Sequence, residues 1–164
     1  MKRFLILAAV GAVALVAGIA IAMAATDSGT ATVSVKQLGK AGKVLVDTKG
    51  RALYFNDQER GSKVLCTGEC VSFWKPLTVT GTPKAGSLPG KLAVATRPGG
   101  ARQVTYRGKR LYSFTLDRPG KVTGDNFKDA FGGQKFTWHV AHPAGAATAA
   151  TTTNTTTGGY PGYP

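Results

Sequence analysis

The 164-residue chain is poor in the side chains that most enzymes use. It has two cysteines, two histidines and eight acidic residues, against 21 lysines and arginines. It contains no nucleophile elbow, no His-Glu-x-x-His zinc motif and no phosphate-binding loop. No spacing among the few carboxylates marks the acid pair of a glycosidase. We therefore expect a protein without catalytic activity and without a bound cofactor.

Long helices are also excluded from most of the chain. The 22 glycines and eight prolines interrupt every candidate helix beyond about ten residues, and only residues 68–74 are expected to form a helical turn. There is no recognition helix, and no pair of stacking aromatics lies in a basic strand. Specific binding to nucleic acid is therefore not expected.

The N-terminus has the pattern of a secretory signal. Lys2 and Arg3 precede an uncharged apolar segment that runs to Ile21, and Ala22-Met23-Ala24 is a small-x-small cleavage motif. We predict a signal peptide over residues 1–24, cleaved after Ala24, and a secreted or cell-envelope location. The alternative is an uncleaved anchor, because the apolar segment approaches the ~18–20 residues that span a bilayer. No cysteine near the cleavage site offers a point of lipid attachment.

The remaining chain divides into a domain and a tail. Residues 143–164 carry no charge. They consist of Ala, Thr, Gly, Pro and Tyr, with one asparagine, Asn154, inside the threonine run over residues 151–157. Such a segment cannot bury enough apolar surface to offset the entropy of ordering, so we predict a disordered tail. After a short linker over residues 25–31, residues 32–142 have the length of one domain.

One motif occurs twice in this domain. Gly50-Arg51-Ala52-Leu53-Tyr54 returns as Gly108-Lys109-Arg110-Leu111-Tyr112, and an apolar segment precedes each copy. A repeat at this distance is typical of a duplicated β-unit. We place copy one at about residues 40–80 and copy two at about residues 100–141.

Each copy is expected to form a hairpin. Residues 43–47 and 52–55 flank the turn at Gly50, and residues 102–106 and 110–114 flank the turn at Arg107-Gly108. Further short strands are expected at residues 33–35, 92–95 and 136–140. The predicted fold class is mostly β: two related β-hairpin units packed as a small sandwich or barrel.

The two cysteines lie close together, in Cys66-Thr67-Gly68-Glu69-Cys70. In an oxidising compartment this pair is expected to form a disulfide, and Gly68 allows the tight curl that it needs. One alternative is a redox pair, although such pairs more often have two-residue spacing. Another is a metal site that adds His139 and His142. We interpret His139 more simply as an edge-strand residue beside a frayed end.

Positive charge is spread along the whole domain. Removing residues 1–24 leaves 19 basic and eight acidic residues, a net charge of +11. Small basic clusters occur at Lys36, Lys40 and Lys43 and around Lys109. They either form a solvated surface or attract an anionic cell-envelope polymer or an anionic membrane surface. Oligomeric state cannot be deduced from these patterns.

Several of these features together resemble the bacterial secreted-repeat family, whose members are often labelled predicted lipoproteins with a Tyr-x-aromatic-x-x-Asp motif. Tyr112, Phe114 and Asp117 stand at the motif positions of copy two. The resemblance also includes the cysteine loop that leads to Trp74, and the closing segment with Trp138. Because the family has no assigned activity, the resemblance implies an envelope location and a β-architecture rather than a particular chemistry.

The first copy departs from this motif. Tyr54 is followed at once by Phe55, and Asp57 comes two residues earlier than the motif requires. Two interpretations of the repeated residues remain open. Each tyrosine ring packs in the core while a nearby aspartate accepts its hydrogen bond, or Tyr112 and Asp117 form part of a ligand groove.

The sequence therefore favours a secreted, cationic binding or structural module of the cell envelope or extracellular space, without catalytic activity. The alternative is an envelope protein that carries out redox chemistry or binds metal through Cys66 and Cys70, with His139 as a further ligand.

Overall fold

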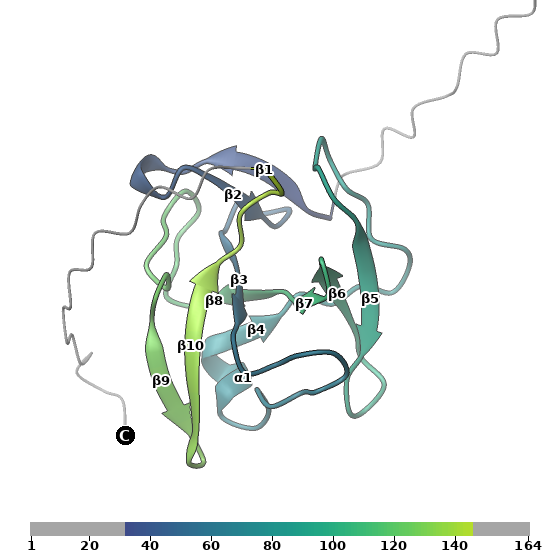
Figure 1. The fold of residues 1–164 in the computed structure, drawn as a ribbon, viewed down its shortest axis with the longest axis vertical. Helices are drawn as coiled ribbons and strands as arrows, with labels where there is room; N and C mark the ends of the chain where they lie inside the picture. The colour runs from purple at the N-terminus through teal and green to yellow at the C-terminus, as the bar shows by residue number, and fades with distance from the viewer. Residues whose placement is uncertain (1–31, 146–164) are drawn as a thin grey trace, which may run out of the picture.

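The computed structural model describes residues 32–145, and strands predominate among them (Figure 1). The N-terminal half forms β1 (Ser34–Gln37), η1 (Gly39–Ala41), β2 (Lys43–Val46), β3 (Leu53–Asn56), α1 (Cys70–Phe73) and β4 (Trp74–Pro76). The C-terminal half forms β5 (Leu92–Thr96), β6 (Arg102–Tyr106), β7 (Lys109–Arg110), β8 (Tyr112–Phe114), β9 (Lys128–Phe131) and β10 (Gln134–Val140). No helix in this part of the chain is long and apolar enough to cross a membrane. The predicted signal peptide, the linker and nearly all of the predicted tail lie outside the described residues.

Both predicted hairpin turns are present. In copy one, the Asp47 N–H donates to the Arg51 carbonyl (3.0 Å) across a loop that ends at Gly50, whose φ is 75°. In copy two, Tyr106 pairs with Lys109 across the two-residue turn Arg107-Gly108. Arg107 and Gly108 have φ values of 52° and 77°, as the turns that match strand twist require.

The central five-stranded sheet is built by exchange between the copies. Its strand order is β4-β8-β3-β10-β9, and Figure 1 shows β10 between β3 and β9. At its centre β3 of copy one pairs antiparallel with β8 of copy two. Outside this pair, β4 of copy one lies on β8 of copy two, and β10 of copy two lies on β3 of copy one. Each copy therefore completes the sheet of the other.

The register of these strands obeys an approximate two-fold symmetry. Trp74 of β4 is opposite Phe114, and Trp138 of β10 is opposite Asn56. Phe114 and Asn56 each stand two residues after the motif tyrosine of their own copy. The tryptophans are thus equivalent residues, each placed on the partner copy's tyrosine strand.

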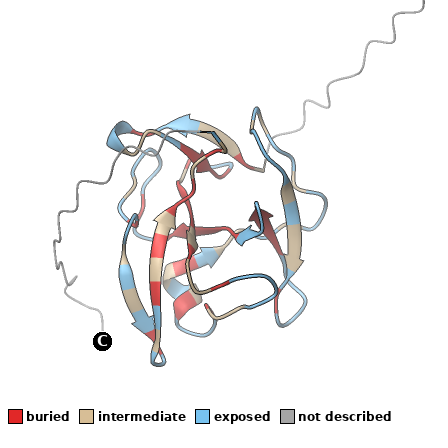
Figure 2. Ribbon diagram, in the orientation of Figure 1, coloured by how far each residue is buried: buried red, intermediate tan, exposed pale blue. Residues whose placement is uncertain are grey.

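Apolar side chains cover both faces of this sheet, because successive residues of a strand point to opposite faces. One cluster contains the aromatic residues Tyr54, Trp74, Tyr112, Phe114, Phe136 and Trp138. The other contains mainly aliphatic residues, Val33, Leu45, Leu53, Val104, Leu111 and Ala141. Figure 2 shows the buried residues concentrated along β3, β6 and β10. The packing is sandwich-like, and the three antiparallel sheets of the described residues do not close into a barrel.

Three local predictions need correction. The segment 110–114 is not one strand, because the Leu111 N–H donates to Val104 (3.0 Å) and its carbonyl accepts from Leu77 (2.9 Å). Residues 128–131 were not among the predicted strands, but they form β9, which contains Asp129 and pairs with β10 through a turn at two positive-φ glycines. His139 is not in an edge strand, since β10 is flanked by β3 and β9.

Candidate functional site

The repeated tyrosines join the two copies and are fully buried. The Tyr54 hydroxyl donates to Asp117 Oδ2 (2.5 Å), and the Tyr112 hydroxyl donates to Glu59 Oε2 (2.6 Å). Glu59 follows Tyr54 by five residues, as Asp117 follows Tyr112. Glu59 is therefore the acidic partner in copy one, whereas Asp57 contacts His139 instead (2.8 Å). Sequence reasoning passed over Glu59, which the five-residue spacing of copy two would have identified.

These hydrogen bonds lie in a setting that keeps the hydroxyls protonated. Burial, followed by the neighbouring carboxylate, raises the pKa of Tyr54 and of Tyr112 well above the ordinary value of 10. The structure does not bring Tyr112 and Asp117 together in one groove, because each is bonded to a residue of the other copy. Their geometry matches the interpretation in which a core tyrosine donates to a nearby carboxylate.

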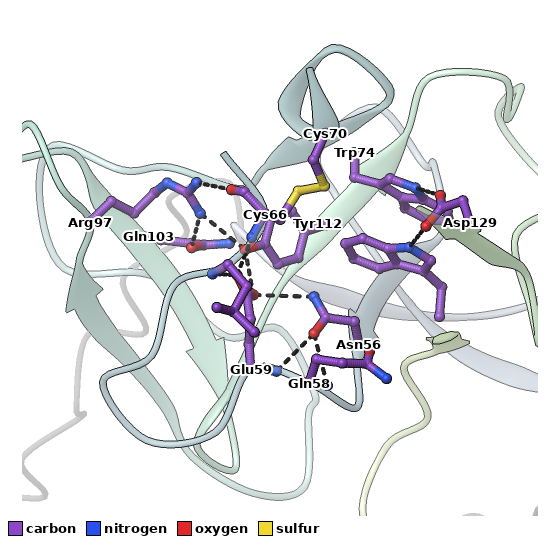
Figure 3. Close-up of a disulfide and its surroundings, with 12 residues drawn as sticks. Asn56, Gln58, Glu59, Cys66, Cys70, Trp74, Arg97, Gln103, Tyr112 and Asp129 are labelled. Atoms are coloured by element: carbon purple, nitrogen blue, oxygen red, sulfur yellow. Dashed lines mark hydrogen bonds between the residues drawn. A yellow bond between two sulfur atoms is a disulfide. The ribbon is translucent and has the colours of Figure 1, made fainter. Parts of the chain in front are cut away.

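The predicted disulfide is present, with Cys66 and Cys70 sulfurs 1.99 Å apart and both residues buried. Figure 3 shows how the surrounding loop is held. The Cys66 N–H donates to Glu59 (2.8 Å), and the Cys66 carbonyl accepts from Arg97 Nη2 (2.5 Å). Arg97 Nη1 also donates to the Tyr112 hydroxyl (3.0 Å). The loop is thus bonded to the same buried network that contains the tyrosine.

The two tryptophans stack on each other in the aromatic core. The rings of Trp74 and Trp138 lie 3.9 Å apart at an angle of 8°. Both indole N–H groups donate to Asp129, at 2.7 Å and 3.0 Å, and Figure 3 shows Asp129 beside Trp74. Burial raises the pKa of Asp129, opposed by these two hydrogen bonds. Phe114, the remaining motif residue, stacks on Trp74 at 4.2 Å, so this group forms packed core.

The residues suggested for a metal site are engaged elsewhere. The cysteines are joined in the disulfide, His139 contacts Asp57, and His142 Nδ1 contacts the Lys43 carbonyl (2.9 Å). Across residues 32–145 there is no group of three or more His, Cys, Asp or Glu side chains arranged to hold a metal ion. The structure therefore does not bring the four suggested ligands into one set.

A groove of about 770 Å³ lies on the other face of the central sheet. Phe55 of β3 and His139 and Val140 of β10 line it. The side chains of Phe55 and His139 point away from the tryptophans, because neighbouring residues alternate along a strand. Its other apolar lining residues include Ala41, Leu111, Val122 and Ala141. A volume of this size suits a small ligand or a segment of a longer one.

The rim of the groove is cationic. Lys40, Arg107 and Lys109 line it with exposed side chains, and His142 lies among them. Asp125 is the single carboxylate among the described lining residues, and it accepts the Val140 N–H (2.9 Å). Because positive groups outnumber this one carboxylate, the rim of the groove carries a net positive charge.

Phe55 is one of two aromatic residues, with Tyr106, that line the groove in the described part of the chain, and the sequence prediction did not include it among the site residues. Its ring lies 5.6 Å from the His139 ring, and Lys109 Nζ lies 4.1 Å from its centroid, within the range of a cation–π contact. Ser113 stands at the equivalent position of copy two. The departure of copy one from the repeat motif, at Tyr54-Phe55, was the signal that pointed to this residue.

Comparison with known proteins agrees with the expected family. Searches of curated proteins and of solved structures gave no match. A family model described as a secreted repeat of unknown function matches residues 93–142, from β5 to the end of β10. This confirms the resemblance for copy two, and the family description agrees with a location outside the cytoplasm. Over residues 93–142 the chain therefore carries a match to the secreted-repeat family, whose function is unknown.

Proposed function

We propose that this protein is a secreted, non-catalytic binding module that holds a segment of an anionic cell-envelope polymer in its cationic groove. The observation that carries the proposal is the groove itself, where Lys40, Arg107 and Lys109 surround an apolar floor and Asp125 is the single acid. Multiple cations on one rim suit a polymer with repeated negative charges better than a neutral ligand.

The placement of the acidic residues supports this proposal. Asp47, Glu59 and Asp117 are buried, and each accepts hydrogen bonds from the protein itself. Asp129 is bonded to the two indoles. Two arginines, Arg97 and Arg110, are buried as well, against three buried acids. Burial therefore leaves the outer surface more cationic by only about one charge, and the described lysines remain exposed on it.

Binding to a polyglycerol-phosphate polymer tests the proposal. The chain beginning at Ala25 is titrated with the polymer at several salt concentrations, and the dissociation constant is measured by fluorescence anisotropy. We expect affinity to fall steeply with salt, because exposed charges are screened within about 10 Å at 0.1 M ionic strength. An affinity that does not change with salt would contradict an electrostatic mode of binding.

Matched charge variants locate the binding surface. The double variant Lys40→Gln/Lys109→Gln removes two exposed groove cations, and Lys128→Gln/Lys135→Gln removes two exposed cations outside the groove. We expect the first pair to weaken binding by about tenfold and the second by less than about threefold. Equal losses from both pairs would assign the binding to diffuse surface charge and would overturn the role of the groove.

A further inference from the structure

The floor of the groove contains a row of side chains from two neighbouring strands, together with Leu111 from the link between β7 and β8. His139 of β10 is directly opposite Phe55 of β3. All three residues line the groove. Leu111 is fully buried, so the accessible apolar surface of this floor comes from Phe55, which is half-buried. A purely polar polyanion would leave that surface unused.

The aromatic ring in this row is not required by the repeat fold. At the symmetry-related position copy two has Ser113, which is buried, and Lys75 takes the place of His139. The same strand geometry is therefore completed there without an aromatic ring. Of the two equivalent positions, only that of Phe55 carries an aromatic ring, and this is the position that lines the groove.

Lys109 links this apolar floor to the cationic rim. Its ammonium lies 4.1 Å from the Phe55 ring centroid, although the side chain is exposed. An anion bound to Lys109 therefore has the ring surface as its immediate neighbour. A ligand with an apolar group next to its charge would contact both residues and would remove apolar surface from water.

We infer that the groove selects amphipathic anions, in which a flat apolar group is attached directly to a carboxylate, phosphate or sulfonate, and that Phe55 with Lys109 forms the selective subsite. This inference rests on the proposed function, because it assumes that the groove is the anion-binding surface, and it specifies the apolar group that the Phe55–Lys109 subsite takes beside the negative charge. It adds a selectivity that the charged rim alone does not provide, because the rim cations respond only to negative charge.

Three small molecules separate the contributions of charge and ring. The chain beginning at Ala25 is titrated with 2-naphthoate, with neutral 2-naphthylmethanol and with acetate, and amide chemical shifts report affinity and position. We expect 2-naphthoate to bind about tenfold more tightly than either of the others, with shifts at Phe55 and Lys109. Equal binding of 2-naphthoate and acetate, or of 2-naphthoate and the alcohol, would overturn the inference.

Substitution of the ring provides the second test. Phe55→Ser introduces the residue of the equivalent position, Phe55→Leu keeps an apolar side chain without a ring, and Lys135→Gln is a charge control outside the groove. We expect naphthoate binding to fall about tenfold in Phe55→Ser, less in Phe55→Leu and not in Lys135→Gln. If Phe55→Ser does not fold, Phe55→Leu and Lys109→Gln supply the comparison, and unchanged naphthoate binding in both would overturn the inference.

The polymer titration keeps the two proposals distinguishable. Polymer binding that persists while naphthoate shows no preference would overturn the amphipathic selectivity alone. Naphthoate binding at the groove without polymer binding would overturn the polymer as partner and retain the subsite. Failure of both ligands would overturn the proposed function together with its refinement.

Discussion

Tyr54 lies directly opposite Tyr112 in the central strand pair, and each hydroxyl donates to a carboxylate of the other copy. Asp117 receives the first hydrogen bond and Glu59 the second. The repeated motif therefore does not form two separate sites, one in each copy. The motif residues instead link the two copies by hydrogen bonds at the centre of the sheet.

Removing either hydroxyl should destabilise the fold. In Tyr54→Phe the buried Asp117 loses a donor, and in Tyr112→Phe the buried Glu59 does. Each carboxylate keeps its other donors, Thr123 for Asp117 and the Leu65 and Cys66 N–H groups for Glu59. The loss of one hydrogen bond to a buried charged group costs about 1–3 kcal/mol. Urea unfolding measures the loss. Adding Asp117→Asn to Tyr54→Phe should recover part of the loss, because the buried carboxylate that lost its tyrosine donor is then replaced by a neutral group. Strictly additive losses would contradict this account.

Alkaline titration should separate these tyrosines from the others. Burial and the neighbouring carboxylates raise the pKa of Tyr54 and Tyr112 above the ordinary value of 10. Because the folded state holds these protons more tightly, their contribution to stability is fully present below pH 10 and is lost as the pH rises through the folded pKa. We expect the absorbance change of these two phenols to coincide with unfolding followed by circular dichroism. Their ionisation in a protein that is still folded would refute the prediction.

The features that could be predicted from the sequence are local. Gly50 and Gly108 specify the two hairpin turns by their backbone freedom, and the spacing of Cys66 and Cys70 permits a disulfide in a tight loop. Each of these depends on a few neighbouring residues. The family resemblance, too, depended on a local motif that includes Tyr112.

The features that escaped prediction depend on distant partners. Strand β9 has weak alternation, and it forms because Asp129 lies beside the two tryptophans while its backbone pairs with β10. The pairing of β4 and β10 with strands of the other copy cannot be predicted from the residues of either segment alone. Glu59 lies in a loop, and only the contact from Tyr112 of the other copy gives it its role. In the sequence Phe55 is only a departure from the motif, and its position in the groove becomes clear only in the folded structure.

Asp129 should give the fold a characteristic acid dependence. Burial raises its pKa above the ordinary value of 3.8, so the protonated form is favoured by folding. Its contribution to the free energy of unfolding is fully present below pH 3.8 and is lost as the pH rises through the folded pKa. The side chain of the Asp129→Asn variant cannot titrate. The free energy of unfolding of the wild type minus that of the variant should therefore decrease as the pH rises from 3.8 through the folded pKa of Asp129.

Urea unfolding at a series of pH values measures this difference. Glu69→Gln, at an exposed acid away from the tryptophans, serves as the control for loss of one carboxylate. The two indoles donate to different oxygens of Asp129, and asparagine has an NH₂ group in place of one of them. An additional loss of about 1–3 kcal/mol that does not vary with pH is therefore expected in the variant. A difference that grows as the pH rises would show that the desolvation of Asp129 is not the dominant effect.

The exchange of strands between copies predicts that a cut between them leaves the domain assembled. Gly81 is exposed in the segment between β4 and β5, and a protease site inserted there would divide the chain into its two copies. The disulfide lies wholly within the first fragment, so it cannot hold the fragments together. We expect them to co-elute in gel filtration at micromolar concentration, because β4 is bonded to β8 and β10 to β3.

The same cut in the Tyr54→Phe/Tyr112→Phe background isolates the contribution of the central tyrosines. With both cross-copy hydrogen bonds removed, the two fragments should separate at a lower urea concentration than the cut wild type, because these bonds now hold two chains rather than one. Fragments that separate without denaturant in the wild-type background would mean that each copy is held mainly by its own hairpin. The antiparallel pairing of β3 with β8 would then be a contact of two independent units rather than the centre of a shared sheet.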